Sequence, residues 1–207
     1  MFITIEGPEG SGKSSQLPEL GRYLESRGFQ VVKTREPGGT KIGDQIREVL
    51  MRMDNTELHP RTEILLFLAA RAQLVEEVIL PSLEQKKIVL CDRYGDSTLA
   101  YQGYGHGFAL DKLRSLLEFA TGGLKPDLTL LLDVDTLTGL KRKKAKEEWN
   151  RLDAFELSFH ERVRAGYHLL AEQEPERWKT VDGSQAPALV QAHMRAVVDE
   201  ALCLEQL

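Results

Sequence analysis

The sequence lacks the features that mark several large classes of protein. It holds two cysteines in 207 residues, too few for a disulfide framework, so we expect a reducing compartment. Its formal net charge of −5 excludes the basic excess of a general nucleic-acid coat. No apolar run approaches the ~18 residues that a transmembrane helix needs, and the N-terminus has no basic leader region. We therefore expect a cytoplasmic protein whose partners include neither a nucleic-acid polymer nor a membrane.

Short apolar segments alternate with longer segments of helical periodicity along the chain. Strands are predicted at Phe2–Glu6, Gln30–Thr34, Ile88–Cys91, Asp127–Asp133 and Trp178–Val181. Each segment is rich in Val, Ile or Leu, as in strands that are covered on both faces. The alternation predicts an α/β fold with a five-stranded parallel sheet and helices on both faces. With no internal repeat or linker, residues 1–207 are expected to form one domain.

Two helices illustrate the predicted packing against the sheet. Ser14–Arg27 carries one apolar stripe, formed by Leu17, Leu20 and Leu24. Ala186–Glu205 shows the same spacing at Leu189, His193, Ala196 and Val197. Residues at such spacing share one helix face, so we expect these stripes to be the covered faces.

The stretch GPEGSGKSS follows the first predicted strand and opens the first predicted helix. It fits the pattern G-x-x-x-x-G-K-[ST] of a P-loop, in which backbone N–H groups cradle phosphates. The lysine of such a loop reaches the β- and γ-phosphates, and the hydroxyl that follows it binds Mg²⁺. A plain glycine turn would not need this full pattern between a strand and a helix. The expected ATP-binding residues are Gly7, Pro8, Glu9, Gly10, Ser11, Gly12, Lys13, Ser14 and Ser15.

A second informative stretch is LCDRYGDSTLAYQG, residues 90–103. Its apolar strand ends in Asp92, the usual position of a carboxylate that holds Mg²⁺ through water, so Ser14 and Asp92 are the predicted metal residues. Arg93 follows at the edge of the sheet where ligands collect. Ser97, Tyr101 and Gln102 follow at near-helical spacing. They predict a second subsite of mixed polar and aromatic character, suited to a base and a sugar.

Two other classes of P-loop protein remain as alternatives. Residues 92–95 match the DxxG of a nucleotide switch that signals to a protein partner, but the sequence has no [NT]KxD. Kinases of different nucleotides or deoxynucleosides would share the phosphate loop and would differ from one another in the pocket that binds the phosphoryl acceptor. The residues by themselves favour a kinase of a small molecule.

Four segments together resemble the thymidylate kinase family, bacterial type, over nearly the whole chain. Residues 90–102 are similar to its signature at Asp92, Arg93, Ser97, Ala100, Tyr101 and Gln102, and the other matching segments are 34–40, 61–77 and 126–142. The resemblance implies a three-layer P-loop NTPase fold with a short lid. It also implies transfer of the γ-phosphoryl of ATP to dTMP with Mg²⁺ in a homodimer. Helices such as Arg61–Leu80 would lie at the dimer interface.

The same resemblance implies roles for residues of the acceptor pocket. Phe67 would stack on thymine, and Arg71, which lies on the same helix face, would hydrogen-bond the base. Tyr101 would lie against the sugar, and Arg47 would grip the dTMP phosphate. The other expected substrate residues are Glu36, Arg93, Ser97 and Gln102. Taken alone, Phe67 and Tyr101 could be ordinary core residues, Glu36 a helix cap and Arg47 a solvated arginine.

The basic stretch LKRKKAKEEWNR resembles the lid, at about residues 141–151. The implied catalytic residues are Lys13, Arg93, Arg142 and Arg151. Arg142 would stack on adenine and Arg151 would clamp a phosphate, oriented by Asp153. A charge run of this kind is more often a solvated helix face. That interpretation is preferred for Lys143, Lys144 and Lys146.

Overall fold

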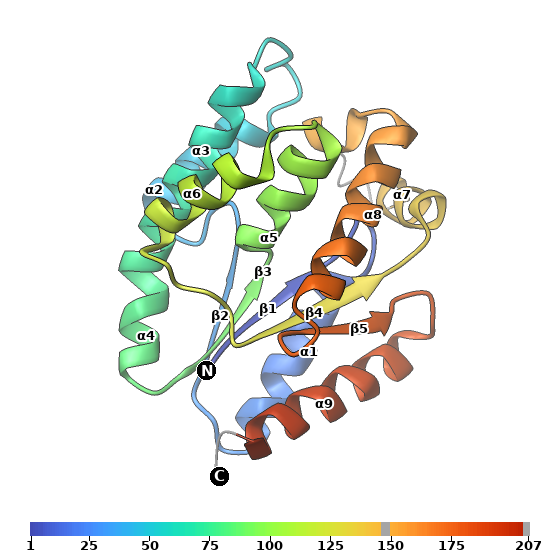
Figure 1. Cartoon of the computed structure of the whole chain (residues 1–207). Coiled ribbons are helices and arrows are strands. Elements are labelled where there is room, and N and C mark those ends of the chain that lie inside the picture. Colours follow the sequence, from blue (N-terminus) through green and yellow to red (C-terminus); the bar gives the residue numbers. More distant parts are fainter. Residues whose placement is uncertain (146–149, 205–207) are drawn as a thin grey trace.

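The computed structural model describes residues 1–145 and 150–204. Its strands form one parallel sheet in the order β2-β3-β1-β4-β5 (Figure 1). Their bounds are β1 Phe2–Glu6, β2 Val31–Arg35, β3 Ile88–Asp92, β4 Leu128–Asp133 and β5 Trp178–Asp182. The predicted fold class is confirmed, and each predicted strand end lies within one residue of the observed end.

Helices cover both faces of this sheet. Their bounds are α1 Lys13–Ser26, α2 Lys41–Met51, α3 Pro60–Leu74, α4 Leu80–Glu84, α5 Gly95–Thr98, α6 Leu110–Thr121, α7 Thr136–Lys144, α8 Leu157–Gln173 and α9 Pro187–Leu204. The π-helices η1 and η2 span Val75–Ile79 and Leu99–Gly105, and the 3₁₀ turn η3 spans Arg151–Ala154. Helices α1 and α9 lie on one face, whereas α3, α5, α6 and α8 lie on the other (Figure 1).

The predicted stripe of the last helix is wrong by one position. The side chains of α9 that enter the core are Val190, Met194, Val198 and Leu202. Leu189 is 58% exposed, and His193 also faces outward. Two apolar stripes run side by side along this helix, so periodicity alone does not choose between them. The packing of α9 against α1 and β5 decides.

Alternation along β1 determines which side chains approach the site. Ile3 and Ile5 face α1 and α9 in the core of that side. The residues between them point to the opposite face because successive side chains of a strand alternate. Glu6, the last residue of β1, is on this second face and is fully buried. Within the described ranges, no helix combines the length and apolar character needed to cross a membrane.

Candidate active site

A cleft of 610 Å³ opens at the carboxyl ends of the strands. This edge is where parallel α/β sheets bind ligands. The cleft walls come from the phosphate loop, the turn after β2, helices α2 and α3, the 92–102 segment, the lid and the loop after β5. Segments far apart in sequence therefore meet at one site, as the sequence predicted.

The phosphate loop has the backbone that its glycines require. At Gly7, with φ +142°, an added Cβ would lie 2.3 Å from the carbonyl oxygen of Leu132. At Gly10, with φ +68°, it would lie 1.9 Å from the carbonyl oxygen of Gly139. Helix α1 begins after Gly12 without a side-chain cap. Its first N–H groups are thus available to an anion, which the positive end of the helix also favours.

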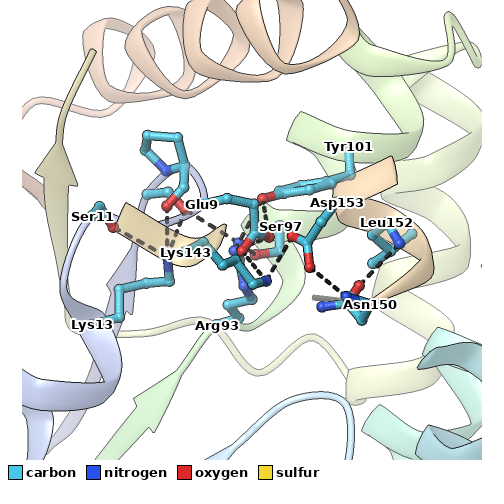
Figure 2. Close-up of polar contacts among 12 residues, drawn as sticks. Glu9, Ser11, Lys13, Arg93, Ser97, Tyr101, Lys143, Asn150, Leu152 and Asp153 are labelled. Atoms are coloured by element: carbon cyan, nitrogen blue, oxygen red, sulfur yellow. Dashed lines mark hydrogen bonds and ion pairs between the residues drawn. The ribbon is translucent and has the colours of Figure 1, made fainter. Parts of the chain in front are cut away.

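Lys13 is buried and folds over its own loop. Its Nζ donates to the carbonyl oxygens of Gly7 (2.9 Å) and Pro8 (2.8 Å) and to Ser11 Oγ (3.1 Å) (Figure 2). Burial, followed by repulsion from Arg93, lowers the pKa of Lys13 to about 8. An anionic phosphate in the loop would oppose both effects and favour the charged ammonium.

Glu9 is the centre of a cluster of charged side chains between the loop and the lid. Its carboxylate accepts from Arg93 Nη2 (2.7 Å), Lys143 Nζ (2.6 Å) and the Tyr101 hydroxyl (2.8 Å) (Figure 2). Burial opposes its ionisation, but Arg93, Lys143 and Lys13 outweigh burial and hold the pKa of Glu9 well below its usual range. Glu9 therefore keeps two cations beside the phosphate loop.

Lys143 was expected on a solvated helix face, and the structure contradicts this. Its side chain is 14% exposed and lies within 2.6 Å of both Glu9 and Asp153 (Figure 2). Lys144, the next residue, is exposed. The expectation failed because α7 turns Arg142 and Lys143 toward the cleft, whereas Lys141 and Lys144 on either side are exposed. Lys146 lies outside the described residues.

The structure does not bring Arg151 to the phosphate loop. Its Nε donates to the carbonyl oxygen of Leu50 (3.0 Å), and its Nη2 pairs with Glu63. Arg151 is absent from the described cleft walls. Asp153, expected to orient Arg151, instead pairs with Lys143 and accepts from the backbone N–H of Asn150 (2.8 Å). The buried carboxylate of Glu63 offers Arg151 a stronger partner than the open cleft does.

Arg142 bridges the lid and the loop after β5. Its Nη1 donates to the carbonyl oxygen of Gly183 (2.8 Å), and its Nη2 to that of Ser184 (3.3 Å). Gln185 and Pro187 line the cleft beside it. The family resemblance implied that Arg142 would stack on adenine, and Arg142 does line the cleft.

Phe67 and Arg71 of α3 both line the cleft. Arg71 is 1% exposed and donates through Nε to Glu36 (2.7 Å), through Nη1 to Thr98 (2.9 Å) and through Nη2 to Glu36 and the carbonyl oxygen of Tyr94 (3.0 Å). Burial raises the pKa of Glu36, and Arg71 opposes that rise. The pair fixes the guanidinium in one orientation, as a recognition group requires.

Three arginines lie near one another in the cleft. Arg35, Arg47 and Arg93 all line the cleft, and Arg47 Nη1 donates to the carbonyl oxygen of Pro37 (2.9 Å). Burial lowers the pKa of Arg47, and the like charges of Arg35 and Arg93 lower it further. Such repulsion is relieved when an anion binds among them. Arg35 had no role in the sequence-based prediction.

Ser97, Tyr101 and Gln102 lie together on the wall formed by α5 and η2. Tyr101 accepts from Arg93 Nη2 (3.0 Å), and its hydroxyl donates to Glu9. Gln102 donates to Glu63 (2.8 Å). The aromatic and polar groups of this wall are therefore held by bonds to neighbouring charged residues.

Ser14 and Asp92 both line the cleft, and their hydroxyl and carboxylate are the hard oxygen ligands that Mg²⁺ prefers. The residues present thus fit a divalent cation held by few protein oxygens, which is the usual arrangement beside substrate phosphates.

The structure brings most of the predicted residues to one cleft. Gly7 and Pro8 act through their carbonyl groups on Lys13, and Arg151 lies elsewhere. Sequence reasoning missed Glu6, Lys143 and Tyr167. The parity of β1 could have placed Glu6 on the face opposite Ile5, but no local pattern marks the other two.

Known proteins similar to this chain point to one family. A family model described as thymidylate kinase matches residues 5–194. The thymidylate kinase of Roseiflexus castenholzii is 52% identical, covering 98% of this chain and 94% of its own length. That of an Exiguobacterium species is 50% identical, covering 92% of this chain and 90% of its own length.

A solved structure agrees with these sequences. The crystal structure of thymidylate kinase from Ehrlichia chaffeensis is 35% identical, with a TM-score of 0.78, and the match covers 96% of this chain and 98% of that one. The chain belongs to the thymidylate kinase family.

Proposed function

We propose that the cleft holds ATP and dTMP with their phosphates facing each other and transfers the γ-phosphoryl, giving ADP and dTDP for dTTP synthesis. The chain is an ATP-dependent nucleoside monophosphate kinase by family. One observation supports placing ATP at one end of the cleft and dTMP at the other: the phosphate loop and the Phe67–Arg71 wall open into the same cleft. A kinase of another nucleotide or of a deoxynucleoside is the alternative that the test must exclude.

The acceptor base lies against Phe67 in this proposal. Arg71 uses four of its five N–H groups on described residues, and one N–H of Nη1 remains to donate to an oxygen of thymine. Tyr101 stands beside the deoxyribose, where its ring would crowd a ribose 2′-hydroxyl. Glu36, Ser97 and Gln102 hold the walls of this pocket through their hydrogen bonds.

The phosphates occupy the cationic middle of the cleft. Arg47 and Arg35 hold the acceptor phosphate, and the loop amides with Lys13 hold the donor phosphates. Arg93 and Lys143, which meet at Glu9, neutralise charge between the two. Such a site works by aligning like-charged groups and stabilising charge as it spreads. Arg142 and the loop after β5 receive the adenine.

Ser14 and Asp92 would hold Mg²⁺, Asp92 through water. The ion would supply positive charge that offsets the negative charge of the phosphates during transfer.

Three further properties belong to the proposal. Residues 1–207 act as one domain with a lid at about 141–151, of which residues 146–149 lie outside the part that the structure describes. The chain forms a homodimer, supported by exposed apolar side chains on α3 and on the neighbouring α6, namely Leu65 (59% exposed), Leu116 (39%) and Phe119 (90%). It works in the cytoplasm, consistent with two cysteines that are both free.

A phosphoryl-transfer assay with ATP and Mg²⁺ tests the proposed function. The acceptors compared are dTMP, dUMP, UMP, CMP, AMP, GMP and thymidine. We expect dTMP to give the highest kcat/KM, with turnover on the order of tens per second. A higher kcat/KM for any other nucleotide, or for thymidine, would assign a different acceptor. Phosphoryl transfer to any of them excludes a non-enzymatic switch.

A further inference from the structure

Arg93 adopts a backbone conformation that arginine rarely takes. Its φ is +69°, in the left-handed region where Cβ crowds the following carbonyl oxygen. Its guanidinium is nevertheless fixed by several acceptors. Besides Glu9 and Tyr101, the Nη1 group donates to Gly7 O (3.2 Å), Ser97 Oγ (3.3 Å) and Tyr167 Oη (3.0 Å).

Behind these acceptors lies Glu6, which is fully buried and lies outside the described cleft walls. Its Oε1 accepts from the backbone N–H of Tyr94 (2.7 Å). Its Oε2 accepts from Ser97 Oγ (2.6 Å) and Tyr167 Oη (2.9 Å). Glu6 therefore holds both the peptide that follows Arg93 and the two hydroxyl groups that receive its side chain.

The direction of these bonds matters. A hydroxyl group has one hydrogen, and a carboxylate can only accept. When Ser97 and Tyr167 donate to Glu6, their lone pairs remain for Arg93. Tyr167, which is also fully buried, thus carries the influence of Glu6 to a cation at the cleft.

We propose that Glu6 and Tyr167 are positioning residues for phosphoryl transfer, which fix the guanidinium of Arg93 between the two phosphates. The inference rests on the proposed function, since it assumes that Arg93 neutralises charge there. Neither residue touches substrate in this scheme, so both act through Arg93.

The electrostatics of Glu6 make this arrangement depend on pH, because only the ionised carboxylate accepts from both hydroxyl groups. Burial, followed by the nearby Asp96 of α5, raises the pKa of Glu6 to about 7. Arg93 and the hydrogen bonds from Ser97 and Tyr167 oppose that rise. Removing a hydroxyl donor should therefore raise the pKa of Glu6 further, because hydrogen bonds to the ionised form favour it.

Tyr167→Phe tests the inference because it removes one oxygen and keeps the ring. We expect kcat to fall by ~10- to 50-fold while KM for ATP and dTMP changes less than threefold, the signature of an interaction lost in the transition state. Tyr104→Phe is the matched control. Tyr104 packs on Gly166, next to Tyr167 in sequence, and this change should alter kcat less than twofold. Circular dichroism checks folding, and Ser97→Ala removes the other hydroxyl donor if Tyr167→Phe fails to fold.

A double-mutant cycle separates positioning from a general structural effect. In an Arg93→Ala background, measured with radiolabelled ATP, adding Tyr167→Phe should change kcat by less than twofold. An equal loss in both backgrounds, or an unchanged kcat in the single variant, would overturn the inference.

A second measurement does not depend on which nucleotide accepts the phosphoryl group. Carbon-13 NMR of the Glu6 carboxyl should show its titration midpoint rising by about one pH unit in Tyr167→Phe. An unchanged midpoint refutes the link between Tyr167 and Glu6 even if dTMP is phosphorylated. A shifted midpoint without dTMP phosphorylation supports the link and rejects the proposed acceptor.

Discussion

Glu6 and Glu9 lie three residues apart and have opposite electrostatic environments. Glu6 ends β1 beside two hydroxyl groups and a backbone N–H, and burial, followed by the nearby Asp96, raises its pKa to about 7. Glu9 lies in the phosphate loop between Arg93 and Lys143, which hold its pKa well below the usual range despite burial. Both carboxylates help to fix Arg93. Glu9 accepts directly from its guanidinium, whereas Glu6 acts through the hydroxyl groups of Ser97 and Tyr167.

The difference shows that burial alone does not decide whether a carboxylate is charged. Desolvation raises the pKa of a buried acid, and only close cations or enough hydrogen-bond donors reverse it. Glu9 has the cations and stays ionised beside the phosphate loop. Glu6 has mainly neutral donors, so its charge changes near neutral pH.

The largest expected effect concerns Lys13, one of the cations that lower the pKa of Glu9. Lys13→Ala should fold yet lose turnover on the order of 10³-fold, because a preorganised charge at the phosphates is removed. Steady-state kcat and a thermal melt measure the two properties. Retained turnover would show that the loop does not hold the transferred phosphates.

The next effect concerns Glu6, whose hydrogen-bond donors are mainly neutral. It is measured in the free energy of unfolding. A raised pKa means that the folded state binds more protons than the unfolded chain between about pH 4.5 and 7, so the Glu6 contribution to stability falls as pH rises through that window. The full loss is about 3 kcal/mol. Asp96, Arg93 and Tyr167 face Glu6, and Lys13 and Arg71 act on it from α1 and α3. The unfolding free energy of wild type relative to Glu6→Gln should therefore decline from about pH 5 to about pH 8.

Glu9→Gln is the matched control for that measurement. A lowered pKa gives a contribution that is present above about pH 4.5 and is lost only in acid. The difference between wild type and Glu9→Gln should therefore stay flat over the range where the Glu6 difference declines. Parallel curves for the two variants would contradict the contrast between the carboxylates.

The smallest effect concerns the lid cation that reaches Glu9. Lys143→Met should lower kcat by roughly tenfold, because one of several charges that neutralise the transferred phosphoryl is lost. The exposed Lys144 offers a matched control, and Lys144→Met should change kcat less than twofold. Equal effects of the two substitutions on kcat would show that Lys143 contributes no more to turnover than a solvated lysine does.

Local sequence patterns were sufficient for the architecture. The P-loop pattern and the alternating apolar segments predicted β1, α1 and the parallel sheet because the covered strands need apolar side chains on both faces. Phe67 and Arg71 were predicted to share a helix face, and both reach the cleft. The stripe of α9 was misplaced because two apolar faces compete along it.

Charge pairing was not predictable from spacing. Arg151 pairs with Glu63, which lies 88 residues away in sequence, and Lys143 pairs with Glu9 across 134 residues. The pairing of each cation with its carboxylate depends on the fold around the lid. A run of basic residues in the sequence does not predict that pairing. Tyr167 was missed because its role lies in one hydroxyl on the buried face of α8, and no local pattern separates that hydroxyl from a core side chain.

A crystal structure with dTMP and a non-hydrolysable ATP analogue would show whether the two nucleotides face each other in this one cleft. We expect thymine stacked on Phe67 beside Arg71, the triphosphate wrapped by residues 9–15, and Arg93 between the phosphates of the two nucleotides. A dTMP molecule bound elsewhere, with the Phe67–Arg71 wall bare, would contradict it.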